Sequence, residues 1–219
     1  MLLMQQLVAA GHVFHVSGEI PRQKLKRYLA KLSQFGIYRD APGRAYDRRK
    51  GIASVHLVVV ELDPETAFWC LLSTAGKLGL NDPAAPKVGE VFDTRKQGQH
   101  LRFRGYELLH QEKRIEKVAG STWTWRLPPK RFAELEAVVV QCARERSKDA
   151  LARLVEQQSS MPLFSGIRGQ VLKLNALAAK LSMKFKHGEL PLPQLPYMTK
   201  LLIYDDPPRL LEVWLESNP

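Results

Sequence analysis

The sequence is poor in cysteine and has no long uninterrupted apolar run. Its 219 residues include two cysteines, Cys70 and Cys142, too few and too far apart for a disulfide framework or a zinc site. We therefore expect both to be apolar core side chains in a reducing compartment. No stretch reaches the roughly 18 apolar residues of a membrane-spanning helix, and the apolar start lacks the basic segment and cleavage site of a secretory signal. These absences predict a cytoplasmic protein without a membrane partner.

Sequence motifs for nucleotide and metal chemistry are also missing. Residues 76–79 lack the glycine spacing of a phosphate-binding loop. The acidic residues at 61–65 gather at a turn, with no second acidic group placed opposite them on a strand, so a two-metal nuclease is not indicated. His12 and His15 are separated by two residues rather than one, which excludes the paired-histidine motif of rolling-circle nucleases. We expect no metal and no other cofactor.

Acidic residues are scarce relative to basic ones, and this imbalance is the strongest signal in the chain. The 33 lysines and arginines outnumber 22 acids, for a net charge of +11 and a pI near 9.8. Values above about 9 are typical of nucleic-acid-binding domains, although proteins that bind acidic partners share them. The excess is also segregated: residues 21–50 hold ten basic and two acidic residues, and further net positive charge lies in 92–117 and 166–188. A surface that follows phosphates requires such segregation, whereas a solubilising surface mixes signs.

Hydrophobic periodicity predicts strands before Pro128 and helices after it. The alternating or continuous apolar segments predict strands at 12–16, 55–62, 67–72, 90–94, 100–110 and 122–127, and residues 55–62 read as a strand buried on both faces. A helix is predicted to start at Pro21 and to end at Gly36, followed by a basic loop at 38–51. From 131 onward the apolar spacing is helical, most regularly over 164–185.

Strand, helix and strand hairpin in that order form the opening half of a ferredoxin-like or RNA-recognition-like sandwich. We therefore predict an α+β protein: a mainly antiparallel sheet of five or six strands with a helix on one side, then a helical C-terminal region. Residues 1–127 would form the basic α+β domain. Residues 128–188 would pack on the sheet or form a small lobe, and 189–219 would be a Pro-rich extended segment and a tail.

The first basic segment offers the densest set of candidate phosphate contacts. Lys24, Arg27 and Lys31 share one face of the predicted helix. The predicted loop adds five cations interleaved with Tyr38 and Tyr46; these cations are Arg39, Arg44, Arg48, Arg49 and Lys50. Cations that contact phosphates and rings that stack on bases are the chemistry of RNA or single-strand binding. The alternative is a solvated helix face followed by a disordered basic loop.

Two further sets of residues carry weaker signals. Arg102, Arg104 and Tyr106 alternate along a predicted strand, so they should share one exposed face and supply a second contact surface. Trp123 and Trp125 also share a face, which favours the core side of a sheet over an exposed stacking platform. Lysines on the last long helix are interpreted as its solvated side.

His12 and His15 are the weak candidates for catalysis. On a strand they would point to opposite faces, so they would not act as a neighbouring pair. Either one could still serve as a general base that cleaves RNA at a 2′-hydroxyl. A strand histidine is more often structural.

The leading hypothesis is a non-enzymatic nucleic-acid-binding protein for RNA or for single-stranded or structured DNA, as one subunit of a larger nucleoprotein complex. The first alternative is a metal-independent endoribonuclease that uses His12 or His15. The second is a structural or regulatory protein that binds an acidic protein partner.

Overall fold

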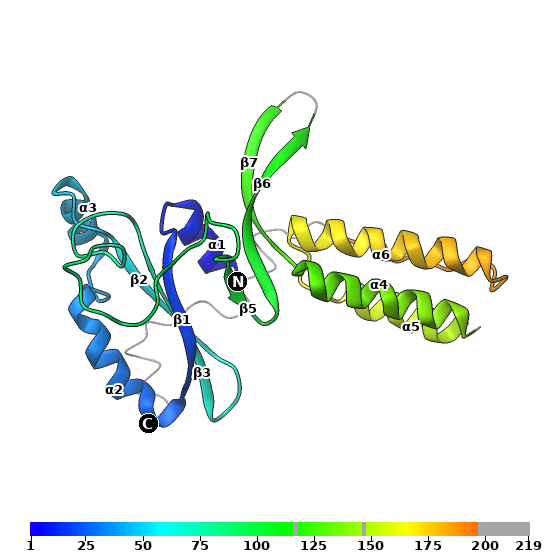
Figure 1. Cartoon of the computed structure of the whole chain (residues 1–219), viewed down its shortest axis with the longest axis horizontal. Coiled ribbons are helices and arrows are strands. Elements are labelled where there is room, and N and C mark those ends of the chain that lie inside the picture. Colours follow the sequence, from blue (N-terminus) through cyan, green and yellow to red (C-terminus); the bar gives the residue numbers. More distant parts are fainter. Residues whose placement is uncertain (116–117, 146–147, 197–219) are drawn as a thin grey trace. The chain divides into compact units, whose positions relative to one another are not determined.

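The computed structural model describes residues 1–115, 118–145 and 148–196, apart from the side chains of residues 112–121 (Figure 1). The described residues fall into two compact units, Met1–Leu101 and the residues from Arg102 onward. The predicted boundary at residues 127 and 128 therefore falls inside the second unit. The predicted fold class is confirmed, because the chain is α+β with antiparallel sheets and a helical C-terminal region. The apolar segments predicted after residue 199 lie outside the described residues.

The first unit is built on a four-stranded antiparallel sheet. Its elements are α1 (Leu2–Ala9), β1 (Phe14–Pro21), α2 (Arg22–Leu32), the 3₁₀ turn η1 (Ser33–Phe35), α3 (Ala41–Arg49), β2 (Val55–Glu61), β3 (Thr66–Ser73) and β4 (Phe92–Asp93). The strand order is β2-β3-β1-β4, so β3 lies between β1 and β2. This is the split β-α-β arrangement that the ferredoxin-like opening predicts, with α3 added before β2.

Helix α2 covers one face of this sheet. Leu25, Leu29 and Leu32 recur at helical spacing and are buried, and Leu32 packs with Val16 and Leu71 from the sheet. The central strand is β3, which is buried along nearly its whole length, whereas β2 is an edge strand with half-exposed side chains. The prediction that residues 55–62 are buried on both faces was therefore wrong. Val55 and Val58, which point to opposite faces of β2, are buried, and its other five side chains are partly or fully exposed.

Residues 41–49 form helix α3, which corrects the prediction of a loop over 38–51 for that part of the segment. The Asp40 carboxylate accepts a hydrogen bond from the Gly43 amide at 2.8 Å and so caps α3, with Pro42 in the first turn. Apolar periodicity could not indicate this helix, because α3 has no buried residue. The predicted end of the preceding helix is confirmed, since Gly36 adopts the left-handed conformation with φ of 67°.

The second unit contains a separate three-stranded sheet, so the prediction of one sheet with five or six strands was wrong. Its strands are β5 (Leu101–Phe103), β6 (Tyr106–Ile115) and β7 (Val118–Arg126), in the order β5-β6-β7. The strand predicted over 100–110 reverses at Arg104 and Gly105, whose φ angles of 49° and 78° are those of a tight hairpin turn. An added Cβ at Gly105 would lie against the Arg131 guanidinium, which is a second reason for glycine there.

Three helices complete the second unit: α4 (Pro129–Arg144), α5 (Lys148–Ser159) and α6 (Ser165–Lys184). All three pack on one another around a shared apolar cluster, and Figure 1 shows α6 running beside α4 and α5. The predicted helical seam over 164–185 is confirmed, since Ile167, Val171 and Leu174 are fully buried. Side-chain hydrogen bonds join β7 and the residue after it to α6. The Gln170 side chain accepts from the amide of Leu127 and donates to its carbonyl. The Thr124 hydroxyl accepts from the Ser165 hydroxyl and from the Gly166 amide.

Candidate nucleic-acid interface

Helix α2 presents a row of cations opposite its buried leucines. Lys24, Arg27 and Lys31 are all exposed, as is Lys26 elsewhere on the same helix. The spacing that places leucines on the sheet necessarily turns the positions between them outward. Among the described residues, none of these four cations forms an ion pair with a carboxylate. No carboxylate among the described residues therefore neutralises their positive charge.

The cations in and next to α3 fall into two sets: Arg39 and Arg44, which bond to other groups of this segment, and an outer set of three exposed cations. Arg39 makes a two-pronged ion pair with Asp47, with nitrogen–oxygen distances of 3.0 and 3.1 Å, so its charge is neutralised. Arg44 is half-buried and donates to the Arg39 carbonyl. Both residues stabilise α3 as well as carrying charge.

The outer set lies at the C-terminal end of α3. Arg48, Arg49 and Lys50 are exposed, and no ion pair to them occurs in the described part of the chain. The Lys50 ammonium lies 4.4 Å from the centre of the Tyr46 ring, and the ring itself remains about half exposed. Tyr38 is similarly exposed. Cations and rings thus alternate here as the sequence predicted, but on a helix.

A second cluster joins the loop before β1 to the start of β2. The Nδ1 of His12 donates to the Leu7 carbonyl at 3.0 Å, because a carbonyl can only accept. The Nε2 of neutral His12 therefore accepts from the Ser54 hydroxyl at 3.2 Å. The ring of His56 meets the ring of His12 edge to face, with centroids 4.8 Å apart. His12 is buried, whereas His56 is half-exposed.

Burial and the charges of two arginines both disfavour the protonated form of the imidazoles in this cluster. Burial lowers the pKa of His12, and the charges of Arg48 and Arg44 lower it further, against a rise caused by the hydrogen bond to Leu7. Burial also lowers the pKa of His56 to about 4, with His12, Arg44 and Arg48 acting in the same direction. Both imidazoles are consequently neutral near pH 7.

His15 occupies a different environment from His12. It is buried in β1, its Nδ1 lies 3.0 Å from the Thr94 hydroxyl, and its ring packs against Phe92. Burial lowers the pKa of His15 to about 4. The predicted opposite orientation of His12 and His15 was wrong, because His12 precedes β1 and its ring reaches His56, which lies on the same sheet face as His15. Both rings are buried in this structure.

The prediction that Arg102, Arg104 and Tyr106 share one exposed strand face was wrong. Arg102 and Arg104 are exposed, but Arg104 lies in the hairpin turn and Tyr106 is buried on the next strand, beneath the Arg131 guanidinium. The three residues therefore do not share a strand face, because the chain reverses between them. The favoured interpretation of the tryptophans is confirmed for Trp125, which is fully buried, while Trp123 is half-exposed and packs its ring on His110.

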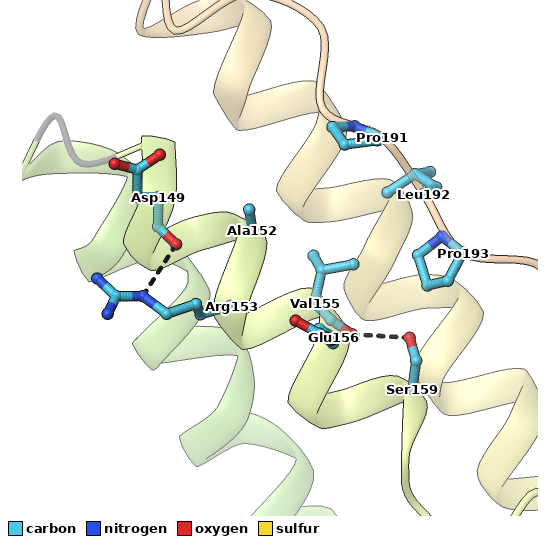
Figure 2. Close-up of a pocket in the computed structure, with 9 residues that line it drawn as sticks. All are labelled: Asp149, Ala152, Arg153, Val155, Glu156, Ser159, Pro191, Leu192 and Pro193. Atoms are coloured by element: carbon cyan, nitrogen blue, oxygen red, sulfur yellow. Dashed lines mark hydrogen bonds between the residues drawn. The ribbon is translucent and has the colours of Figure 1, made fainter.

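An open groove of about 700 Å³ lies in the second unit between α5 and the segment 191–193. Figure 2 shows the residues that line it. Its lining mixes signs, with Asp149 and Glu156 beside Arg153, and two prolines form the opposite wall. Negative carboxylates repel phosphates, so this groove lacks the chemistry of the basic helices in the first unit.

Within the ranges that the structure describes, no helix is long and apolar enough to cross a membrane. Over the same ranges, no three histidine, cysteine or acidic side chains come close enough together to hold a metal ion.

Sequence reasoning missed Ser54 and His56 as members of the histidine cluster. His56 lies far from His12 along the chain, and only the pairing of β2 with β3 and β1 with β3 brings the two together. The apolar run around His56 was interpreted as a simple strand, and a single histidine within a strand carries no motif. Comparison of the sequence with protein-family models and curated proteins, and of the fold with solved structures, finds no match.

Proposed function

We propose that this protein binds nucleic acid through its phosphates, with the outward faces of α2 and α3 as the contact surface and with RNA or unpaired DNA as the ligand. The observation that supports this most is the set of seven exposed cations that no described carboxylate neutralises: Lys24, Lys26, Arg27, Lys31, Arg48, Arg49 and Lys50. Neutralising phosphates releases counterions, which is the main source of sequence-independent affinity.

The aromatic rings favour unpaired strands over a closed duplex. Tyr38 and Tyr46 are each about half exposed, and they lie within or next to the cationic helix α3. Exposed rings stack on unpaired bases, and this stacking tolerates any base sequence. Five cations lie with these two tyrosines within the thirteen residues 38–50, so the rings stand next to groups that can contact phosphates.

Three variants of equal charge change test the proposal. The first replaces Lys24, Arg27 and Lys31 with glutamine, and the second replaces Arg48, Arg49 and Lys50. The matched control replaces Lys173, Lys180 and Lys184, which are exposed on α6. Because the total charge falls equally in all three, any difference reports the place of the charge. All positions are solvated, so folding should change by less than about 0.5 kcal/mol for each substitution.

The measurement is the affinity for a fluorescent single-stranded oligonucleotide, of RNA and of DNA, over a range of salt concentrations. If each cation contacts one phosphate, the slope of log affinity against log salt falls by about 2 in each of the first two variants. The α6 control keeps the wild-type slope. Wild-type affinity and slope in the α2 and α3 variants alike would show that these helices are only solvated surface.

A further inference from the structure

Helix α6 carries a second series of apolar positions besides its buried seam. The seam faces the other two helices, because Leu174 and Ala178 belong to the apolar cluster that α6 shares with α4 and α5. The second series also repeats at intervals of three and four residues, and none of its members is polar. This outer stripe consists of Gly169, Leu172, Ala176, Ala179 and Met183. Since an α-helix turns by about 100° per residue, the outer stripe lies on the side of α6 opposite to Leu174 and Ala178.

Both large side chains of the outer stripe are open to solvent. Leu172 is 43% exposed and Met183 is 63% exposed. Eleven residues separate them in the sequence, so they lie about 16 Å apart along the helix axis. A Cβ added at Gly169 would meet no atom within 4 Å, so the stripe is open there too. Single exposed apolar residues are ordinary, but an aligned series over three turns of one helix is typical of an interaction surface.

A row of lysines borders the outer stripe. Lys173, Lys180 and Lys184 each follow a member of the stripe directly in the sequence, and all three are exposed. Among the described residues, no carboxylate forms an ion pair with any of them. Helix α6 itself contains no acidic residue. A face that is merely solvated has polar residues between its lysines, whereas this face has aliphatic ones. A partner of the stripe must therefore offer apolar side chains together with negative charge.

We propose that the outer stripe of α6 is a docking site for an acidic amphipathic helix of another protein. Apolar side chains of the partner helix pack between Leu172 and Met183. The alanines between these two residues let the two helix axes approach closely, and the flexible methionine adapts to the partner's side chains. Carboxylates beside the partner's apolar residues pair with the three lysines. This inference is independent of the proposed nucleic-acid binding, which uses α2 and α3.

Charge also distinguishes this partner from the other occupants of such a face. A second copy of the chain that docked through its own α6 would bring a second set of lysines to the contact and no acid, and like charges disfavour that pairing. Nucleic acid would neutralise the lysines but would place Leu172 and Met183 against a charged backbone. An acidic helix satisfies both the lysines and the apolar side chains.

The first experiment compares three fluorescent synthetic helical peptides for binding to the full-length protein. The acidic peptide has leucines repeated every three and four residues, with glutamates beside them. The second peptide has lysine in place of each glutamate, and the third has the composition of the acidic peptide in an order that destroys the leucine stripe. We expect binding of the acidic peptide alone. Failure of this peptide to bind, or equal binding of the third peptide, would overturn the proposal.

The second experiment locates the binding with variants of exposed residues, which should fold as the wild type does. Leu172→Gln combined with Met183→Gln should bind the acidic peptide at least about tenfold more weakly. Replacing the three α6 lysines with glutamine should weaken binding at low salt and matter little at high salt. The matched control is Val138→Gln on α4, whose side chain is 41% exposed and which should bind as the wild type does. Wild-type affinity in the Leu172 and Met183 double variant would overturn the docking site.

The methyl signal of Met183 provides a readout in the unaltered protein. With isotope-labelled methionine methyl groups, NMR should show that the acidic peptide shifts the Met183 signal and leaves unchanged that of Met4, which is fully buried in the first unit. A soluble paramagnetic reagent should broaden the Met183 signal when no peptide is present. Protection of Met183 in the free protein would overturn the proposal, because this chain or a second copy would then already cover the stripe.

The outcomes separate this inference from the proposed function. A protein that binds the acidic peptide at α6 but binds neither RNA nor DNA would support the docking site and overturn the proposed function. A lower salt slope for RNA in the variant of the three α6 lysines would assign these lysines to nucleic acid and overturn the docking site.

Discussion

His15 of β1 and His56 of β2 lie in one row across the sheet, on either side of Leu72 of β3. Directly paired residues point to the same face, so both imidazoles lie on the face opposite the one that packs on α2. Burial lowers the pKa of each to about 4. One face of a small sheet therefore carries two imidazoles that are neutral near pH 7.

This pair predicts a loss of stability in mild acid. The unfolded chain titrates its histidines near pH 6.5, whereas the folded chain holds His15 and His56 neutral down to about pH 4. Between these values the unfolded state binds more protons, so the stability contributed above pH 6.5 is lost progressively as the pH falls towards 4. His15 alone, being deeply buried, accounts for up to ~3 kcal/mol.

Urea unfolding at pH 7.5, 5.5 and 4.5 measures this loss. His15→Asn keeps a side-chain partner for the Thr94 hydroxyl but cannot titrate in this range. The variant should be less stable than the wild type at pH 7.5, because ring packing on Phe92 is lost, but its stability should fall less on acidification. Parallel pH profiles for the two proteins would mean that His15 does not titrate as this structure implies.

The sequence was sufficient to predict features that depend on a strong apolar pattern. Apolar residues recur at regular spacing in three elements: the hairpin of β2 and β3, helix α2 and helix α6. Each of these elements occurs where it was predicted. Burial of one face is the physical cause of that period. Where no face is buried, as in α3, the period vanishes, and only the capping residue Asp40 and the following Pro42 mark the helix.

Other features depend on partners that are distant in the chain or on a single turn. Arg102, Arg104 and Tyr106 alternate like one strand, yet the chain reverses at Arg104 and Gly105, so that Arg102 and Tyr106 lie on separate strands and Arg104 lies in the turn. Ser54 and His56 join His12 only because β3 pairs with both neighbouring strands. Periodicity describes one element at a time, so neither the separation into two sheets nor the histidine cluster could follow from it.

Gln158 of α5 provides a stability prediction for the helical unit. Its side chain is buried, and neither its carbonyl oxygen nor its amide nitrogen has a hydrogen-bond partner in the described part of the chain. An unpaired buried amide costs about 1–3 kcal/mol, so Gln158→Leu, which fills similar space, should raise the free energy of unfolding by about that amount.

Chemical denaturation compares this variant with Gln157→Leu, its exposed neighbour on the same helix. The control removes no buried polar group and should leave stability nearly unchanged. A loss of stability in Gln158→Leu would instead show that an ordered water satisfies the amide, because removing that water's partner is costly.

Tyr46 distinguishes stacking from charge in the proposed nucleic-acid contact. Its ring is about half exposed, and the Lys50 ammonium lies 4.4 Å from its centre. If the ring stacks on an unpaired base, Tyr46→Ala should weaken binding of single-stranded RNA by about 1–3 kcal/mol. The salt dependence should stay the same, because stacking releases no counterions. Tyr46→Phe keeps the ring and should bind nearly as the wild type does.

The measurement is the slope and intercept of log affinity against log salt for the three proteins. A flatter slope in Tyr46→Ala would show that the ring acts by holding Lys50 against a phosphate. Equal affinities for all three proteins would show that bases do not contact this helix at Tyr46.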